Sequence, residues 1–592
     1  MQAIWLVLGV LVLFSAAYLA YGRYLAQFVE LDESHETPAH KYEDGQEYVP
    51  AKKPVLLGHH YSSIAGGAPI VGPITAGVWW GWLPALLWIA IGNPLMGSVH
   101  DFVSLSSSIR HEGKSIGYVI GQYVGDRGKN MLLWFAFLTI ILVVAVFAFV
   151  VAVVFNAYPS AATASIIYIA LALLFGVYLY QLNLPFIPGT VAFVALVFGG
   201  VWFGIQNPLV LATGDTAPWI LPTIAESANI SVWVPVIIIY AFIASVLPVW
   251  TLLQPRDYLS SFLLYTGVGG TLLAVIVGTF VASDPTKLDI GIHAWNGFMA
   301  GDYAKPLFPL LFVTIACGTI SGFHSLVSSG TTAKQLNRET DARAIGYGGM
   351  LGEGLLATTA LITLAVAGIT VSGGGVGQAL PNFATGGGII LSTVGIPESF
   401  GAPFMALVMV SFLLTSTDTA LRLGRYMLEE IVATPETTVQ EFSVNKYANS
   451  GIQSLAAFAL VVSGTWGTLW PLFGGANQML AALALLTATV WLANWDESKQ
   501  LISTGVPMAI MLVITVAALL YLSLYTNLYQ GFLMGGLAGE GLAAQVSTGV
   551  QIVLALILVY LGIALAQIGY ENISSASGGP EAAVTDGGEE SD

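Results

Sequence analysis

The sequence predicts an all-α, polytopic membrane protein, and three observations support that fold class. The 592 residues are 56% hydrophobic and only 9% charged, with a mean hydropathy of +0.78, whereas soluble domains carry about 25% charged residues. Apolar runs long enough to cross a bilayer recur along the chain, and their length favours helices over the short alternating segments of a β-barrel. The basic residues also gather on one side of the resulting spans.

Taken in order, the apolar runs predict about 15 transmembrane helices. The predicted spans are residues 3–22, 62–77, 82–108, 130–155, 162–181, 187–206, 232–252, 258–282, 306–328, 346–371, 399–419, 451–470, 474–495, 504–526 and 547–568. The first span has no basic residue before it, so we do not expect a cleaved signal peptide.

The basic residues orient these spans. With the N-terminus outside, every Lys and Arg except Lys287 and Lys305 falls on the cytoplasmic side. The positive-inside rule produces such a bias only when the span count and the orientation are both nearly right. We therefore expect a multi-pass protein with its N-terminus outside and its C-terminus in the cytoplasm.

Span order and composition divide the chain into four regions. They are an N-terminal helix with an acidic loop (1–57), a core (58–430) with halves near 58–206 and 232–420, additional C-terminal transmembrane helices (431–568) and an acidic tail (569–592). From residue 571 the tail holds six acidic residues and no basic one, which predicts disorder. Because the formal net charge is −16, we expect no nucleic-acid partner, since a phosphate backbone needs a basic face.

The second span is interrupted. Residues 58–73 read Gly-His-His-Tyr-Ser-Ser-Ile-Ala-Gly-Gly-Ala-Pro-Ile-Val-Gly-Pro, which places glycines and prolines in a membrane-length apolar segment. Inside a bilayer such a break survives only where freed backbone groups face protein or water, and transporters bind solutes at such breaks. A kinked, tightly packed helix is the simpler alternative. His59 and His60 stand at the mouth, where they either gate and admit protons or merely cap the interface.

The seventh span, 232–252, is interrupted as well. It carries Pro248 at mid-membrane and Pro255 at its end, and it runs opposite to the second span. Two interrupted helices in oppositely oriented halves predict an inverted-repeat transporter, with spans two to six and seven to eleven as the halves. Arg256 and Asp257 follow at the inner end, where they form either a functional pair or an interfacial one.

Ionisable residues within spans are costly and usually functional. Asp101 follows His100 in the third span, and Glu353 lies in the glycine-rich tenth. Both are candidates for protonation, because an unpaired buried carboxylate prefers to be neutral. Asp418 precedes Arg422 by four residues, which predicts an ion pair on one helix face.

The ninth span surrounds a histidine with hydroxyl groups. His324 lies within Cys-Gly-Thr-Ile-Ser-Gly-Phe-His-Ser-Leu-Val-Ser-Ser-Gly-Thr-Thr, residues 317–332. Hydroxyls alone often serve only as contacts between helices. An imidazole among them can carry a proton near neutral pH, whereas hydroxyls and unwound carbonyls can hold sodium. The pattern leaves proton and sodium coupling open.

These stretches together resemble the carbon starvation protein A (CstA) family, which includes peptide and pyruvate transporters. The matching stretches are 58–73, 247–259 (Leu-Pro-Val-Trp-Thr-Leu-Leu-Gln-Pro-Arg-Asp-Tyr-Leu), 317–332 and 415–426 (Thr-Ser-Thr-Asp-Thr-Ala-Leu-Arg-Leu-Gly-Arg-Tyr). They follow one another in the family's order. Tyr61 and Gly66-Gly-Ala-Pro69 depart slightly from the family's usual residues, which bears on substrate choice.

The resemblance implies a secondary active importer in the plasma membrane that takes up peptides or pyruvate-like small carboxylates with a coupled cation, H⁺ being favoured. It also implies the five-plus-five inverted repeat of the amino acid–polyamine–organocation superfamily, in which unwound segments hold the solute. A solute carboxylate would lie at a half-helix N-terminus. The implied solute-binding residues are Ala65, Gly66, Gly67, Ala68, Pro69, Ile70, Val71, Ser245, Pro248 and Trp250. With the buried ionisable groups, the coupling and gating candidates are His59, His60, Asp101, His324, Ser328, Ser329, Glu353 and Asp418.

Two other functions stay open at this point. A starvation sensor or transceptor would need a partner protein, because no soluble output domain is visible in the sequence. A Na⁺-coupled, amino-acid-type symporter would use the same fold with another ion. A channel fits less well, since two asymmetric broken helices suit alternating access better than a continuous filter.

An enzyme is not expected. His35-Glu-Thr-Pro-Ala-His40 has one residue too many for a helical zinc motif, and Pro38 opposes a helix there. The single cysteine, Cys317, rules out an intrachain disulfide and a cysteine-based metal cluster. No Walker motif occurs, so an ion gradient is the expected energy source. We therefore expect no metal and no cofactor, only a coupling ion (H⁺ or Na⁺), a small solute and the lipid bilayer.

Overall fold

The protein is all-helical, as its sequence predicts. The computed structural model describes residues 1–592 except 46, 219–220, 301–304, 367–375, 433, 464–465, 496–500, 540 and 577–592. Within these residues, helices are joined by loops, and extended pairing is limited to isolated β-bridges. Of the expected acidic tail, residues 569–576 belong to the last helix and 577–592 lie outside the described residues.

The helices follow the apolar runs of the sequence. In chain order they are α1 (Ile4–Ala16), α2 (Gly22–Phe28), α3 (Pro38–Lys41), α4 (Lys53–Ile64), α5 (Ala68–Trp80), α6 (Trp82–Gly92), α7 (Ser98–Arg110), α8 (Ile116–Ala157), α9 (Pro159–Gly176), α10 (Phe186–Gln206), α11 (Ala228–Val246), α12 (Leu253–Leu264), α13 (Gly270–Val281), α14 (Leu307–Thr314), α15 (Gly322–Val327), α16 (Gly348–Val366), α17 (Val376–Ser392), α18 (Glu398–Val432), α19 (Thr438–Val444), α20 (Lys446–Val462), α21 (Trp466–Ala493), α22 (Leu501–Leu520) and α23 (Leu542–Ala576). Short π-helical turns continue several of them, among them η2 (Asn93–Gly97), η3 (Val177–Gln181) and η7 (Ser328–Thr332).

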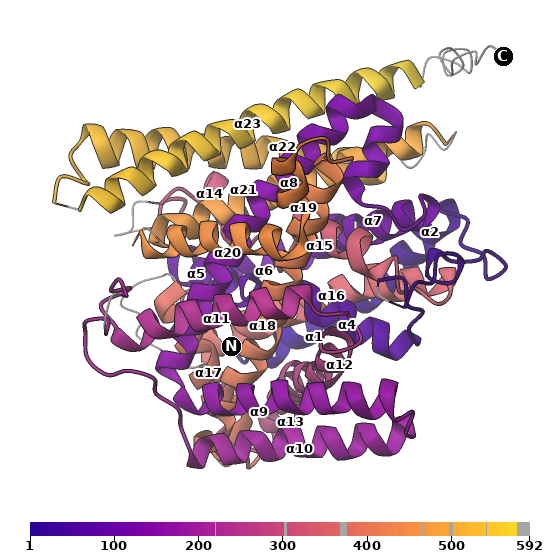
Figure 1. The fold of residues 1–592 in the computed structure, drawn as a ribbon. Helices are drawn as coiled ribbons and strands as arrows, with labels where there is room; N and C mark the ends of the chain where they lie inside the picture. Colours follow the sequence, from indigo (N-terminus) through magenta and orange to yellow (C-terminus); the bar gives the residue numbers. More distant parts are fainter. Residues whose placement is uncertain are drawn as a thin grey trace, which may run out of the picture.

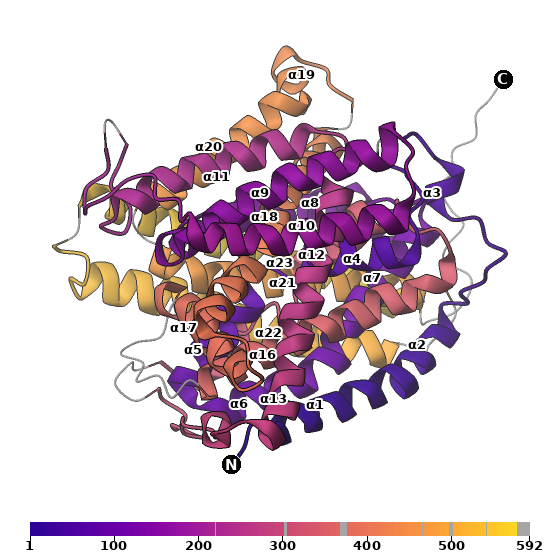
Figure 2. The same ribbon diagram turned by 90° about the horizontal axis from the view of Figure 1, so that it is seen from below.

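Long helices surround a buried pair at the centre of the bundle. Helices α8 and α18 pack against each other there, and almost every residue of α8 from Leu132 to Phe155 is buried. Figure 1 shows α9 and α10 side by side at one edge of the molecule and α23 at the opposite edge. Figure 2, the view from below, shows the loop after α2 at one margin of the molecule and the N-terminus at another.

Breaks between helices at three places in the described chain matter for the candidate site and its predicted residues. The first break, residues 65–67, separates α4 from α5 where the glycine- and proline-rich motif predicts it. The second, residues 247–252, separates α11 from α12 and contains Pro248, also as predicted. The third, residues 315–321, separates α14 from α15 inside a span that the apolar run predicts to be continuous.

The predicted number of spans is not confirmed. Twelve helices or joined helices of the described chain are long and apolar enough to cross a membrane, against about 15 expected from the apolar runs. The three remaining runs, 62–77, 306–328 and 451–470, correspond to α5, to α14 with α15, and to α20, all of which are shorter. The inverted repeat stays a prediction.

The contacts at the two ends of the bundle involve different parts of the chain. At one end the Met1 carbonyl accepts a hydrogen bond from Ile290, and the loop after Lys287 packs on the junction of α5 and α6. At the opposite end, basic residues meet acidic ones, as in the 2.7 Å pair of Lys53 Nζ with Asp341 Oδ1. Residues assigned to the cytoplasmic side by the positive-inside rule thus contact one another.

Candidate functional site

The first break is enclosed on all sides. Every residue from 58 to 77 is buried. A Cβ on Gly66 would lie 2.8 Å from Cζ of Phe147 in α8, and one on Gly67 would lie 2.7 Å from Cδ2 of Leu413 in α18. There is no room beside these glycines for a methyl group, and therefore none for a solute. The break is closed in this conformation, and a solute reaches it only if the surrounding helices move.

The third break is held by amide side chains from distant helices. Asn93 Nδ2 donates to the Gly318 carbonyl at 3.2 Å, and Gln478 Nε2 donates to the Phe312 carbonyl at 2.8 Å. Asn477 Oδ1 accepts from the backbone N–H of Phe323 at 2.9 Å. These amides replace intrahelical partners that the break removes, as a bilayer interior requires.

The start of α5, directly after the first break, packs against the third break. A Cβ on Gly72 would meet the backbone of Thr314 and Ile315, with the Ile315 Cα 3.0 Å away. From the other side, a Cβ on Gly318 would lie 3.7 Å from the Cα of Pro69. The half-helix that follows the first break therefore packs against the unwound segment of the third break in the middle of the bundle.

The second break lies elsewhere, so the predicted solute-binding residues fall into two groups. Residues 65–67 form the first break, and residues 68–71 are the first residues of α5. Ser245 Oγ instead donates to Ser450 Oγ of α20 at 3.2 Å, and the ring of Trp250, two residues after Pro248, lies 6.1 Å from that of Tyr180 in η3. The structure does not bring Ser245, Pro248 and Trp250 to the first break.

A buried chain of ionisable groups runs beside the third break. Asp101 accepts from two imidazoles: Oδ1 from His100 Nδ1 at 2.7 Å and Oδ2 from His324 Nδ1 at 2.9 Å. His324 Nε2 faces Glu353 Oε2 at 3.4 Å. The Cys317 sulfur, one His324 ring nitrogen and one Glu353 oxygen lie within 4.8 Å of one another. All five side chains are buried, so the structure brings three of the predicted coupling residues into one cluster.

The two carboxylates of this chain differ in their hydrogen bonds. The sequence treats both Asp101 and Glu353 as unpaired, and for Asp101 that is wrong, because residues 223 positions apart in the chain meet to form its pair with His324. Among the described residues, neither carboxylate oxygen of Glu353 has a hydrogen-bond partner. Glu353 is therefore the buried carboxylate whose charge the protein leaves least compensated.

The remaining candidates on α4 and η7 border this chain. His60 Nδ1 bonds a hydroxyl of η7 at 2.9 Å, while its Nε2 has no partner within the described part of the chain. Ser328 Oγ is buried and likewise unpartnered there. Ser329 Oγ donates to the Ser325 carbonyl at 2.7 Å and accepts from the Ile116 amide at 3.2 Å. The Ser329 hydroxyl is thus already hydrogen-bonded to backbone groups.

A second buried network joins α4, α12 and α18. His59 Nδ1 lies 2.7 Å from Asp257 Oδ2, and the amide of Gln335 donates to His59 Nε2 at 3.3 Å. Arg256 donates to Asp257 Oδ1 through Nε at 3.0 Å and Nη2 at 2.9 Å. Its Nη2 also reaches Asp418 Oδ1 at 3.1 Å, and its Nη1 bonds the other Asp418 oxygen. Arg256 is fully buried between two carboxylates.

This network corrects one predicted pair and confirms another. The expected pair of Asp418 with Arg422 is replaced by the pair with Arg256, 162 residues away in sequence. Arg422 Nη2 instead donates to the carbonyls of Ala244 at 3.0 Å and Leu247 at 2.7 Å, at the second break. Backbone carbonyls at that break accept the hydrogen bonds of the Arg422 guanidinium in place of the Asp418 carboxylate. The pair of Arg256 with Asp257 forms as expected, although it is buried rather than interfacial.

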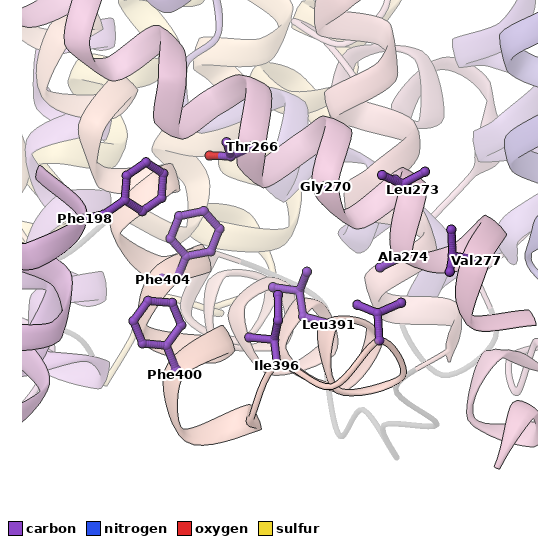
Figure 3. A pocket seen from close by; sticks show the side chains of 11 residues that line it. Phe198, Thr266, Gly270, Leu273, Ala274, Val277, Leu391, Ile396, Phe400 and Phe404 are labelled. Atoms are coloured by element: carbon purple, nitrogen blue, oxygen red, sulfur yellow. The ribbon is translucent and has the colours of Figure 1, made fainter. Parts of the chain in front are cut away.

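An apolar hollow of about 370 Å³ lies apart from both networks. Figure 3 shows Phe198, Phe400 and Phe404 on one side of it and Leu273 and Val277 on the other. One lining side chain, a threonine in the turn before α13, carries a hydroxyl, and that hydroxyl donates to a backbone carbonyl of its own helix. Such a surface suits an acyl chain and offers nothing to a carboxylate.

Several residues of the site escape prediction from the sequence. Asn93, Asn477 and Gln478 hold the third break, and their signal in the sequence is that amides are rare inside apolar spans. Gly318 in the unwound segment and Gly322 at the start of α15 are the signal for the break itself. His35 and His40, excluded as a zinc pair, bond separate partners at the surface.

Comparisons with known proteins agree with the geometry. A family model described as carbon starvation protein CstA matches residues 2–372 and 370–518. The peptide transporter CstA of Campylobacter jejuni is 33% identical over 87% of this chain and 79% of its own length. The peptide transporter CstA of Escherichia coli is 33% identical over 87% and 80%, and the pyruvate/proton symporter BtsT of Escherichia coli is 32% identical over 88% and 81%.

Solved structures give a more distant likeness. A manganese transporter of Eremococcus coleocola aligns with 90% of this chain and 99% of its own, at 12% identity and a TM-score of 0.44. The family match extends over most of the chain, and several relatives exceed 30% identity across more than two thirds of both sequences. The chain belongs to the carbon starvation protein CstA family.

Proposed function

We propose that this protein is a secondary active importer of peptides or of small carboxylates such as pyruvate, driven by a proton gradient. The observation that carries the proposal is the contact of the third break with α5, the half-helix that follows the first break, at Gly72 and Ile315 in the middle of the bundle. Discontinuous helices meeting at mid-membrane are the site architecture of secondary transporters. The names of the relatives, peptide transporter and pyruvate/proton symporter, supply the solutes.

The proposed solute site lies between residues 65–71 and residues 315–321. A carboxylate, common to peptides and pyruvate, would bind at the N-terminus of α5, where the helix dipole favours an anion. The closed packing around Gly66 and Gly67 represents an occluded conformation in this scheme. The role of Ser245, Pro248 and Trp250 stays a prediction for the second break.

The proposed coupling site is the cluster of Asp101, His324 and Glu353. These groups touch the third break, so a change in their charge can act on the solute site directly. Sodium would need several free oxygen ligands, whereas the Ser329 hydroxyl is already hydrogen-bonded to two backbone groups. The cluster therefore favours H⁺ over Na⁺. In this scheme Ser328 faces the coupling path, His59, His60 and Asp418 act as gating groups, and no cofactor beyond the coupling ion is required.

The proposed orientation places the N-terminus outside and the C-terminus in the cytoplasm of a plasma-membrane protein. The contacts support it, because Met1 lies with the loop that carries Lys287, one of the two basic residues assigned outside. Lys53, Lys334 and Arg110 meet acidic partners at the opposite end.

The test is uptake into proteoliposomes. Labelled pyruvate and a labelled dipeptide are offered under an imposed proton gradient and then under a sodium gradient, with protein-free liposomes as the control. Accumulation of one solute under the proton gradient alone is the expected result. Accumulation under sodium alone would overturn the coupling assignment. No accumulation of either solute, in protein shown to be inserted, would overturn the importer.

A further inference from the structure

Three side chains of different chemistry converge in the closed interior. Cys317 lies in the unwound segment before α15, His324 in α15 and Glu353 in α16. One sulfur, one ring nitrogen and one carboxylate oxygen from these residues lie within 4.8 Å of one another. His324 and Glu353 are fully buried, and Cys317 is 3% exposed. These elements are adjacent only in the folded chain, so the fold itself assembles the three donors.

The histidine is oriented toward the other two groups. Its Nδ1 lies 2.9 Å from Asp101 Oδ2, so Nδ1 carries the proton and donates it to the carboxylate. The lone pair of the neutral ring is then on Nε2, which faces Glu353 Oε2 at 3.4 Å. A carboxylate that fixes one ring nitrogen while the other is left free is the arrangement that supports a metal-binding histidine.

The donors lack a partner at their centre. Within the described chain, His324 Nε2 and both carboxylate oxygens of Glu353 have no hydrogen-bond partner. Buried carboxylates are normally hydrogen-bonded or paired with a cation. The Cys317 sulfur accepts from Asn477 Nδ2 at 3.3 Å, a contact that also stabilises a thiolate. The thiol itself donates to Ser321 Oγ at 3.4 Å. One atom from each of Cys317, His324 and Glu353 thus lies close to the other two, and the histidine and glutamate atoms have no hydrogen-bond partner in the described chain.

We propose that Cys317, His324 and Glu353 form a binding site for one thiophilic divalent cation of the zinc class. Sulfur, nitrogen and oxygen donors together match Zn²⁺, Co²⁺ and Cd²⁺, whereas Na⁺, Mg²⁺ and Ca²⁺ take oxygen ligands. On binding, the thiol releases its proton to the solvent, and the charges of the thiolate and the Glu353 carboxylate neutralise the ion. Three protein ligands leave the fourth tetrahedral position to a water molecule.

Such an ion would link the third break to α16. Because Cys317 belongs to the unwound segment and Glu353 to a continuous helix, a shared ion would hold these elements together in the closed arrangement. We therefore expect the cation to inhibit import. This inhibition rests on the proposed function, whereas binding of the cation does not.

The binding test uses cobalt, because a thiolate bonded to Co²⁺ gives a charge-transfer absorption band in the near ultraviolet. The full-length protein, purified in detergent, is titrated with CoCl₂ and then with ZnCl₂. We expect one Co²⁺ per chain, a charge-transfer band, and loss of that band when Zn²⁺ displaces the cobalt. Absence of the band would overturn the site.

The variants separate this site from other metal-binding groups. Cys317→Ser is nearly isosteric and should abolish the band, and Glu353→Gln should weaken Co²⁺ binding by about tenfold or more. His35→Gln removes a half-exposed imidazole that pairs with Glu339, and it should leave the band unchanged. Each variant is first compared with the wild type by gel filtration. An unchanged band in Cys317→Ser would overturn the site.

Uptake provides a second readout with distinguishable outcomes. Micromolar ZnCl₂ should reduce solute accumulation by the wild-type protein and should have no effect on Cys317→Ser. A protein that binds Co²⁺ through sulfur but imports neither pyruvate nor dipeptide supports the site and contradicts the proposed function. A protein that imports solute but shows no charge-transfer band supports the function and overturns the site.

Discussion

At the residue scale, the central feature is a histidine between two carboxylates of unequal character. Asp101 is fixed by two imidazole donors, whereas Glu353 faces only the Nε2 atom of His324 at 3.4 Å. Asp101 therefore orients the ring, and Glu353 is free to exchange its partner. A coupling cation is expected to act on Glu353 and to depend on Asp101 for its geometry.

Removing either charge should uncouple transport. We expect Asp101→Asn and Glu353→Gln to reduce gradient-driven uptake to background while leaving counterflow exchange of labelled solute partly intact, because exchange needs the solute site but no net cation movement. Both are measured in proteoliposomes. Glu398→Gln, which removes a half-exposed carboxylate at the start of α18, is the matched control and should transport normally. Unchanged uptake in both core variants would remove these carboxylates from the coupling role.

The ion pairs show which contacts could be predicted from the sequence and which could not. Proximity in sequence predicted the pair of Arg256 with Asp257 and also predicted a pair of Asp418 with Arg422, which the structure replaces. Four residues along a helix is a sound spacing, but it cannot show that a second arginine approaches Asp418 from another helix. Counting cysteines likewise could not show that Cys317 meets a histidine and a glutamate.

At the element scale, the breaks differ in what creates them. The first contains Gly66 and Gly67 with Pro69 beside them, so the local residues alone oppose a continuous helix and the break was predicted. The third depends on Asn93 and Asn477, which supply hydrogen bonds from helices far away in the sequence. Hydrogen bonds from distant helices cannot be seen in the residues of the span itself. For this reason residues 306–328 resemble one continuous span.

The contact between α5 and the third break should be intolerant of added volume. A methyl group on Gly72 would strike the backbone of Thr314 and Ile315, which cannot move aside as a side chain can. We expect Gly72→Ala to lower the free energy of unfolding by about 1–3 kcal/mol, measured by thermal unfolding in detergent, and to impair uptake.

A glycine in open space provides the comparison. A Cβ on Gly199 of α10 would have no atom within 4 Å of it. Gly199→Ala should be neutral or more stable by up to about 1 kcal/mol, since alanine favours a helix. If Gly72→Ala proves as stable as Gly199→Ala, α5 and the third break are not packed as tightly as the structure indicates.

At the scale of the whole molecule, the acidic loop closes the end of the bundle that carries most of the basic residues. Glu47 Oε2 lies 3.1 Å from Lys334 Nζ, and its Oε1 lies 3.5 Å from Arg425 Nη2. The backbone of Ala51 donates to the carbonyl of Gln335 at 3.0 Å. Gln335 also contacts His59. It therefore connects the loop to the buried network of α4 and α12.

This closure should weaken in acid. Burial raises the pKa of the Glu47 carboxyl, but the charges of Lys334 and Arg425 and a hydrogen bond from Tyr426 outweigh burial and hold that pKa below its usual value. A depressed pKa in the folded state stabilises the fold at neutral pH, and the stabilisation is lost as the pH falls through that pKa.

The corresponding measurement compares Glu47→Gln with the wild type by thermal unfolding from about pH 7 to about pH 2, a range that extends well below the usual glutamate pKa of about 4.3. We expect the variant to be less stable by about 1 kcal/mol near neutral pH, because the pair is partly exposed. The difference should disappear only as the pH falls below the usual glutamate range and through the depressed pKa of Glu47, where the wild-type carboxyl also becomes neutral. Glu43→Gln, an exposed acid of the same loop, should match the wild type throughout. A difference that persists at low pH would show that Glu47 acts through packing.

The orientation of the bundle is open to direct labelling. In a Cys317→Ser background, Lys287→Cys and Lys41→Cys each introduce one thiol at an exposed position. A membrane-impermeant maleimide added to intact cells should label the residue-287 variant, and it should label the residue-41 variant only after lysis. The reverse pattern would invert the proposed topology.

The buried network around Arg256 also constrains how this sequence can change over time. The guanidinium lies between Asp257 and Asp418, and Asp257 is shared with His59, so three helices depend on one set of charges. Losing any single member leaves an uncompensated charge inside the membrane, at a cost of about 3–5 kcal/mol. Substitutions at these four positions are therefore tolerated only in combination, and descendants of this chain will keep or replace the whole set together.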